Sequence, residues 1–224
     1  MAISLERRRK WLKVALQVQV ISVLWTLVEA TVGAVAAHIS GSLAVSAFSV
    51  DSAIELISGL ALLLRFVIEF LSPAESSGNR SSLLERVATG IVAFCLFGLA
   101  AFIAWRSGQA FALRQPMQVS TIGLILAAIS SIVSPWLAGM KRRVGIKLDS
   151  HALIGDAACT MTCAYMAWVL LLGLGMQWLF GFWWVDPLAA LGILYFVLYE
   201  AWDSFAAMRS GTPHLHDGLH HHPG

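Results

Sequence analysis

Long apolar stretches alternate with short polar or basic segments along the whole chain. Six of these stretches are long enough to cross the roughly 30 Å hydrocarbon core of a bilayer as helices. They cover about residues 11–37, 41–70, 84–105, 116–140, 150–175 and 186–208. The pattern predicts an all-α integral membrane protein, with six transmembrane helices in residues 11–208, a basic N-terminal segment at 1–10 and a tail at 209–224.

The composition agrees with a membrane protein. Hydrophobic residues make up 58% of the chain and charged residues 12%, whereas soluble domains are about 45–50% apolar. The net charge of +2 is too small to indicate a nucleic-acid partner. The three cysteines, Cys95, Cys159 and Cys163, all fall in apolar stretches, which argues against a secreted disulfide framework.

Basic residues are distributed unevenly over the predicted connections. One side of the membrane receives the segments 7–13, 80–86 and 141–147 together with Arg209, and the other receives Arg106 and Arg114. Lys and Arg collect on the cytoplasmic side of membrane proteins. Both termini are therefore predicted to be cytoplasmic, and the tail with them.

The outer ends of the last two spans carry residues typical of a membrane interface. Trp178, Trp183 and Trp184 indicate an aromatic belt. Asp186 directly precedes Pro187, and an acidic cap followed by proline at the first helical position is a common helix start. We therefore expect Asp186 to cap its own helix at the outer interface.

Two acids stand out inside the second span. Asp51 and Glu55 are four residues apart and so share one face of a helix. A carboxylate in mid-membrane costs several kcal/mol, and two on one face also repel each other. A bound cation or a transported proton would offset this cost. The competing interpretation is a structural pair satisfied by neighbouring helices.

An internal repeat connects the second span with the fifth. Asp51 and Glu55 lie nine and thirteen residues after Ser42, and Cys159 and Cys163 lie nine and thirteen residues after Ser150. Three spans separate the copies, so the second is inverted in the membrane, as in many secondary transporters. At about 1.5 Å per residue, Asp51 is then nearly level with Cys163, and Glu55 with Cys159.

Two carboxylates and two thiols that converge near the midplane would suit a borderline or soft divalent ion. Zn²⁺ fits first, with Cd²⁺ close behind, and Mg²⁺ or Ca²⁺ fits less well. Thiols lose their protons when they bind a metal, so metal entry is expected to release protons. The alternative for Cys159 and Cys163 is simple packing, because cysteine behaves as a small hydrophobe in membrane helices.

Other ionisable residues occupy supporting positions. Asp156 lies on the cysteine-bearing face, where a ligand, an acid on the entry path and a helix-packing group are comparable interpretations. Glu29 and Glu200 are intramembrane acids without a partner at the repeat spacing, so they indicate hydrogen bonding between helices first and a metal or proton path second. The tail contains five histidines that favour a metal-collecting role over a neutral one: His214, His216, His220, His221 and His222.

The chain resembles the cation diffusion facilitator family of divalent-metal exporters. The resemblance rests on the Ser-x-Ala openings at 42–44 and 150–152, on the acid pair, on His151 to Ala157 and on the segment 184–190, which begins Trp-Val-Asp-Pro. It implies a six-helix cation-efflux bundle that works as a homodimer and exchanges metal for protons. It also implies a metal site made from Asp51 and Glu55 with positions 159 and 163, and His151 near the metal path.

Two features set the chain apart within that resemblance. Cysteines stand where the family usually has His and Asp, which indicates softer ions. The cytoplasmic C-terminal domain usual in the family is missing from this sequence, so it resembles a short branch. We therefore expect a secondary transporter, not an enzyme, that exports Zn²⁺ or a similar ion across a bacterial inner (plasma) membrane. The alternative is a membrane protein that binds metal as a sensor or accessory and transports nothing.

Overall fold

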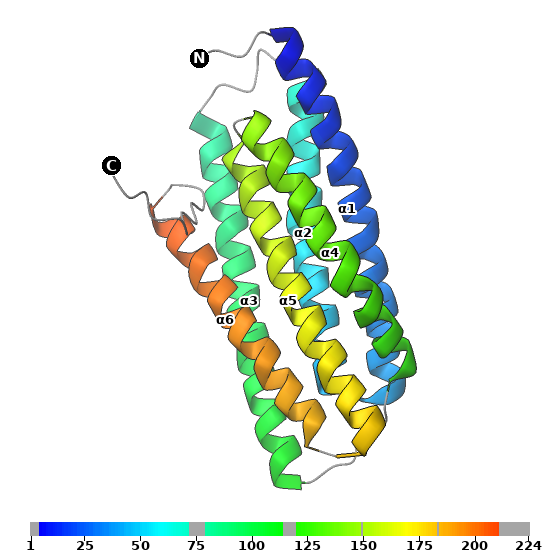
Figure 1. Ribbon diagram of the computed structural model, residues 1–224. Coiled ribbons are helices and arrows are strands. Elements are labelled where there is room, and N and C mark those ends of the chain that lie inside the picture. Colours follow the sequence, from blue (N-terminus) through cyan, green and yellow to red (C-terminus); the bar gives the residue numbers. More distant parts are fainter. Residues whose placement is uncertain (1–4, 72–78, 114–119, 149, 183, 211–224) are drawn as a thin grey trace, which may run out of the picture.

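A computed structural model describes residues 5–71, 79–113, 120–148, 150–182 and 184–210 as a bundle of six α-helices (Figure 1). The helices are α1 (Leu5–Ser40), α2 (Leu43–Leu71), α3 (Asn79–Leu113), α4 (Thr121–Leu148), α5 (His151–Phe180) and α6 (Val185–Ser210). Trp183, the side chain of His151 and the five tail histidines lie outside what the structure describes.

Five helices are long and apolar enough to cross a membrane, namely α1, α3, α4, α5 and α6. The remaining helix, α2, has 29 residues, which at 1.5 Å per residue make about 43 Å, also more than a bilayer core requires. The predicted all-helical membrane fold is confirmed. Several helices are longer than their apolar stretches: α4 continues to Leu148 through the basic segment that was expected to follow a span.

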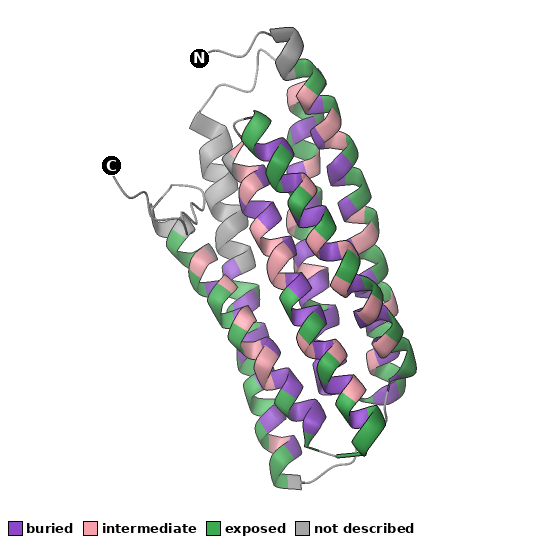
Figure 2. Ribbon diagram, in the orientation of Figure 1, coloured by how far each residue is buried: buried purple, intermediate pink, exposed green. Residues whose placement is uncertain are grey.

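The centre of the bundle is α2, which packs against α1, α3, α5 and α6. Its buried positions run from Leu43 to Phe66. Exposed positions of the helices in front of it lie on the outer side of the bundle (Figure 2). The chain reaches α2 from α1 through a tight turn at Gly41, whose φ of 67° lies in the left-handed region that glycine adopts without strain. This short connection makes α1 and α2 antiparallel neighbours.

Close approach of α1 and α2 is fixed by polar contacts between them. Ser49 Oγ donates to the carbonyl of Ala30 at 2.9 Å, and Gln19 Nε2 donates to the carbonyl of Gly59 at 3.2 Å. A Cβ on Gly33 would lie only 3.0 Å from that of Ser49. Small residues therefore let the two backbones meet, as is usual for helix pairs in membranes.

The repeat has a physical basis in helix capping. Ser42 Oγ accepts from the backbone N–H of Val45, and Ser150 Oγ accepts from that of Leu153. Each serine therefore caps the helix that carries its copy of the repeat. Figure 1 shows α2 and α5 running in opposite directions, as the inverted repeat predicts.

Asp186 caps a different helix from the one expected. Its carboxylate accepts from Ser42 Oγ and, at 2.8 Å, from the backbone N–H of Leu43. It therefore satisfies donors at the start of α2 instead of its own α6. The reason is tertiary: α6 packs against α2, and at this position a buried carboxylate finds free N–H groups and the positive end of a helix dipole.

Two apolar clusters leave a polar layer between them. One cluster contains Ala44 to Phe48 of α2 and Met166 to Leu174 of α5, whereas the other contains Leu62 of α2 and Leu153 of α5. Asp51 and Glu55 of α2 and residues 156–160 of α5 fall between these positions on their helices. The layer is therefore enclosed by apolar side chains at both ends.

Pro135 interrupts the hydrogen bonds of α4. Proline has no N–H, so the carbonyl of Ser131, four residues earlier, loses its helical donor. Trp168 of α5 replaces that donor, because its Nε1 lies 2.9 Å from the Ser131 oxygen. This contact joins α4 to α5 close to the polar layer.

We predict that Trp168→Phe lowers the free energy of unfolding by about 1 kcal/mol, because the freed carbonyl has no water partner in a membrane. In a Pro135→Ala background the alanine N–H takes over that carbonyl, so the same tryptophan change costs less. Thermal unfolding of the four variants in detergent measures the difference. Equal losses in both backgrounds would show that the indole hydrogen bond contributes nothing.

Candidate metal site

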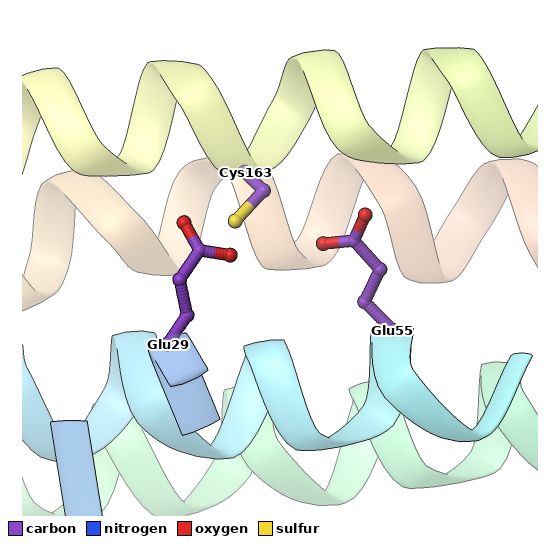
Figure 3. Close-up of side chains that lie close together, drawn as sticks. All are labelled: Glu29, Glu55 and Cys163. Atoms are coloured by element: carbon purple, nitrogen blue, oxygen red, sulfur yellow. The ribbon is translucent and has the colours of Figure 1, made fainter. Parts of the chain in front are cut away.

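Three metal-ligating side chains from three helices meet in the polar layer. Ligand atoms of Glu29 (α1), Glu55 (α2) and Cys163 (α5) all lie within 4.8 Å of one another. Figure 3 shows the two carboxylates and the thiol pointing toward a common space between the helices. Among the described residues, this is the group whose geometry allows three protein ligands around one ion.

Each member of this group is held by a neighbour. Ser134 of α4 donates to Glu29 Oε1 at 3.1 Å, and Thr160 of α5 donates to Glu55 Oε1 at 2.7 Å. Cys163 is hydrogen-bonded to Glu55. Such contacts fix the orientation of carboxylates before any ion arrives, which reduces the cost of assembling a metal site.

Glu55 therefore lies beside Cys163, one turn from the partner that the depth estimate gave it. The estimate assumed that the capping serines are separated by one bilayer core of about 30 Å. Thirteen residues from each cap to Glu55 and to Cys163 correspond instead to a separation of about 39 Å. The reason is that α2 and α5, with 29 and 30 residues, extend beyond the core.

Asp51 and Cys159 lie beside Glu200 of α6. The Cys159 thiol is hydrogen-bonded to the Glu200 carboxylate. Asp51 is buried on α2, within electrostatic range of Glu200, Glu55 and Glu29. Of the four residues expected to form one site, Glu55 and Cys163 lie together with Glu29, and Cys159 lies against Glu200. A single site that also includes Asp51 and Cys159 stays a prediction.

Asp156 forms a buried ion pair that the sequence did not reveal. Its Oδ2 lies 2.7 Å from Lys141 Nζ of α4. In the sequence, Lys141 belongs to a basic segment with Arg142 and Arg143 that is expected at the membrane surface, yet Lys141 is only 1% exposed while both arginines are exposed. One signal was available: Lys141 follows Ser134 by seven residues and therefore lies on the same face of α4.

The donor set limits what the site can bind. Two carboxylates and one thiol suit a borderline or soft divalent cation, and a fourth position stays open for water or another protein ligand. Phosphate or another anion would be repelled by the same carboxylates. The fold and this site together define a helical integral membrane protein with a buried cluster of carboxylate and thiol side chains that could hold a cation.

Comparison with known proteins gives the family. The family model described as the cation efflux transmembrane domain matches residues 19–209. The chain belongs to this family, which confirms the resemblance to the cation diffusion facilitators.

Curated relatives agree with this assignment. The chain is 26% identical over 164 residues to a cation-efflux pump of Klebsiella pneumoniae, covering 72% of the chain and 54% of that protein. It is 29% identical over 166 residues to a cation-efflux pump of Yersinia enterocolitica, with the same coverage. An uncharacterised transporter of Synechocystis is 24% identical over 162 residues, covering 72% of the chain and 52% of that protein. The chain spans about half the length of these relatives.

We predict that Glu29→Gln weakens Zn²⁺ binding at least about tenfold, because it removes one anionic ligand from the group. Glu69→Gln is the matched control, since it makes the same change on α2 about 21 Å from Glu55 along the helix. Isothermal titration of detergent-solubilised protein gives both affinities. Unchanged affinity of Glu29→Gln would remove Glu29 from the binding set.

The two thiols should behave differently when each is replaced by serine. Cys163→Ser is expected to weaken Cd²⁺ binding at least about tenfold, and Zn²⁺ binding by less, because thiolates favour the softer ion. Cys159→Ser should weaken the binding of both ions less, because the Cys159 thiol is hydrogen-bonded to Glu200, outside the group of Glu29, Glu55 and Cys163. The same titrations decide, and equal losses for both variants would place Cys159 in the binding set as well.

Proposed function

We propose that this protein exports a divalent transition metal from the cytoplasm in exchange for protons. Zn²⁺ is the leading cargo, with Cd²⁺ or another soft ion next. The observation that carries the proposal is the meeting of Glu29, Glu55 and Cys163 between three helices in the middle of a membrane bundle. Asp51 and Cys159, with Glu200, are proposed to form the adjacent position on the path of the ion.

The position of the acids supports transport over a purely structural role. Asp51 and Glu55 sit on the helix that contacts four others, and both are buried between two apolar clusters. A carboxylate with a purely structural role would be stabilised at the lowest free-energy cost by a single fixed hydrogen-bond or ion-pair partner. Here several acids lie within reach of each other, and a charge arrangement of this kind is relieved by a cation that enters and leaves.

Proton exchange follows from the same donor set. A thiol and closely spaced carboxylates cannot all be ionised in an apolar interior without a cation. Binding of a dication displaces protons from them, and departure of the dication lets protons return. Protons that return from the outside would drive export, and rocking of the helices around the central site would expose it alternately to each side.

The proposed orientation rests on the basic end of the bundle. Exposed basic residues gather where α1 begins and α4 ends, and these two ends pack into one apolar cluster. This end would be cytoplasmic by the distribution rule for Lys and Arg. The start of α1 and the end of α6 lie at the same end of the bundle (Figure 1), so a six-helix crossing would leave both termini in the cytoplasm.

The relatives add support at the level of the family. Two of them are named cation-efflux pumps, and we extend that activity to this chain because the family match over residues 19–209 contains the buried site. A bacterial inner membrane and a homodimer are part of the same proposal. The histidines at 214–222 would gather metal at the cytoplasmic side.

We predict that vesicles containing the protein and an acidic lumen accumulate Zn²⁺, and that vesicles without a pH gradient accumulate much less. Asp51→Ala and Glu55→Gln should each lower the initial rate at least about tenfold, since each removes a charge from the path. A fluorescent zinc indicator enclosed in the vesicles gives the rates, and Glu69→Gln is the control for the loss of an acid elsewhere on α2.

Two outcomes contradict this proposal. Accumulation no greater than in protein-free vesicles would reject transport. Wild-type protein that binds Zn²⁺ in titrations but moves none would favour the alternative, a membrane sensor or accessory protein that holds metal for signalling.

A further inference from the structure

Lys141 brings a positive charge into the layer of acids. Its Nζ lies 2.7 Å from Asp156 Oδ2 and 2.7 Å from Thr160 Oγ1. It is 1% exposed, and it is the only buried Lys or Arg among the residues whose burial the structure describes. A lysine in a membrane helix near the end of a span would normally extend its ammonium toward the interface. This one points inward.

Thr160 connects the ammonium to the candidate metal site. An ammonium only donates, so the threonine oxygen must accept from Lys141. The single threonine hydrogen has two acceptors within reach, Glu55 Oε1 at 2.7 Å and the carbonyl of Asp156 in its own helix at 3.0 Å, and the carboxylate is the nearer and the more strongly accepting of the two. A single hydroxyl therefore separates the lysine charge from a carboxylate of the group that contains Glu29 and Cys163.

The charges show what this arrangement can do. A dication between Glu29, Glu55 and Cys163 would lie close to the ammonium in surroundings of low dielectric, where like charges repel strongly. Without the dication, the ammonium balances Asp156 and part of the charge of Glu55. The lysine thus stabilises the metal-free site and weakens the hold on the metal.

We propose that Lys141 is a tethered counter-cation of the candidate metal site, which keeps metal binding weak enough for release. The proposal rests on the proposed function for the identity of the cargo. It differs from a simple clamp between α4 and α5, because a clamp would need only the pair with Asp156 and would not change how tightly the site holds an ion.

The test compares equilibrium Zn²⁺ binding by four forms of the full chain in detergent at pH 7. These are the wild type, Lys141→Met, Asp156→Asn and the double variant. Lys141→Met is expected to bind Zn²⁺ at least about tenfold more tightly than wild type, with slower turnover in the vesicle assay because release is slower. Lys147→Met, the same change on an exposed position of α4, should leave both unchanged.

The double variant keeps the test decisive if Lys141→Met does not fold. Removing one partner of a buried ion pair is destabilising, whereas replacing both is tolerated. In Asp156→Asn the amide oxygen can still accept from the ammonium, so this variant loses less than Lys141→Met, which leaves the Asp156 carboxylate without a cation. Both Asp156→Asn and the double variant lack the aspartate, so their difference reports the lysine charge alone. The double variant should bind at least about tenfold more tightly than Asp156→Asn.

Equal Zn²⁺ affinity with and without Lys141, in either background, would overturn the proposal, and so would weaker binding on its removal. Failure of the proposed function looks different: wild-type protein would bind Zn²⁺ but transport none. In that case the affinities of the variants would still decide the role of Lys141.

Discussion

The structure depends on how a layer of acids is kept neutral inside an apolar bundle. Glu29, Asp51, Glu55 and Asp156 are all buried, in surroundings where an unbalanced charge is very costly. The hydroxyls of Ser134 and Thr160 and the ammonium of Lys141 stabilise part of this negative charge. The rest of the negative charge would be neutralised by protons or metal ions, which can bind and dissociate. In the proposed function, this unbalanced charge is what makes the layer able to exchange ions.

The surrounding architecture holds this layer in place. Two apolar clusters close it at both ends, and α2 carries the acid pair through the centre of the bundle. The start of α2 is fixed by Asp186 of α6, and its flank is fixed to α1 where Gly33 meets Ser49. These contacts set the height and rotation of α2, and therefore the position of Glu55 relative to Cys163. The ion pair of Lys141 and Asp156 joins α4 to α5, and the hydroxyl of Thr160 connects it to Glu55.

Several features follow from local sequence. Long apolar stretches cannot satisfy their backbone in lipid except as helices, so the membrane bundle was predictable. Ser42 and Ser150 precede apolar runs and cap them, so the two copies of the repeat begin where the sequence indicates. The inverted repeat predicted that the acids of α2 and the thiols of α5 approach one another, with Glu55 level with Cys159; in the structure Glu55 meets Cys163 and Glu29. Whether they hold a metal with Asp51 and Cys159 stays a prediction.

By itself, the sequence determined the membrane class, the helices and the faces on which Asp51, Glu55, Cys159 and Cys163 lie, because helical periodicity is a local property of the chain. Only the tertiary structure decided which faces meet. In the tertiary structure Glu29 lies beside Glu55, Lys141 points inward to Asp156, and Asp186 caps the start of α2. The physical reason is that the slide and rotation of one helix against another are set by contacts between residues far apart in the chain.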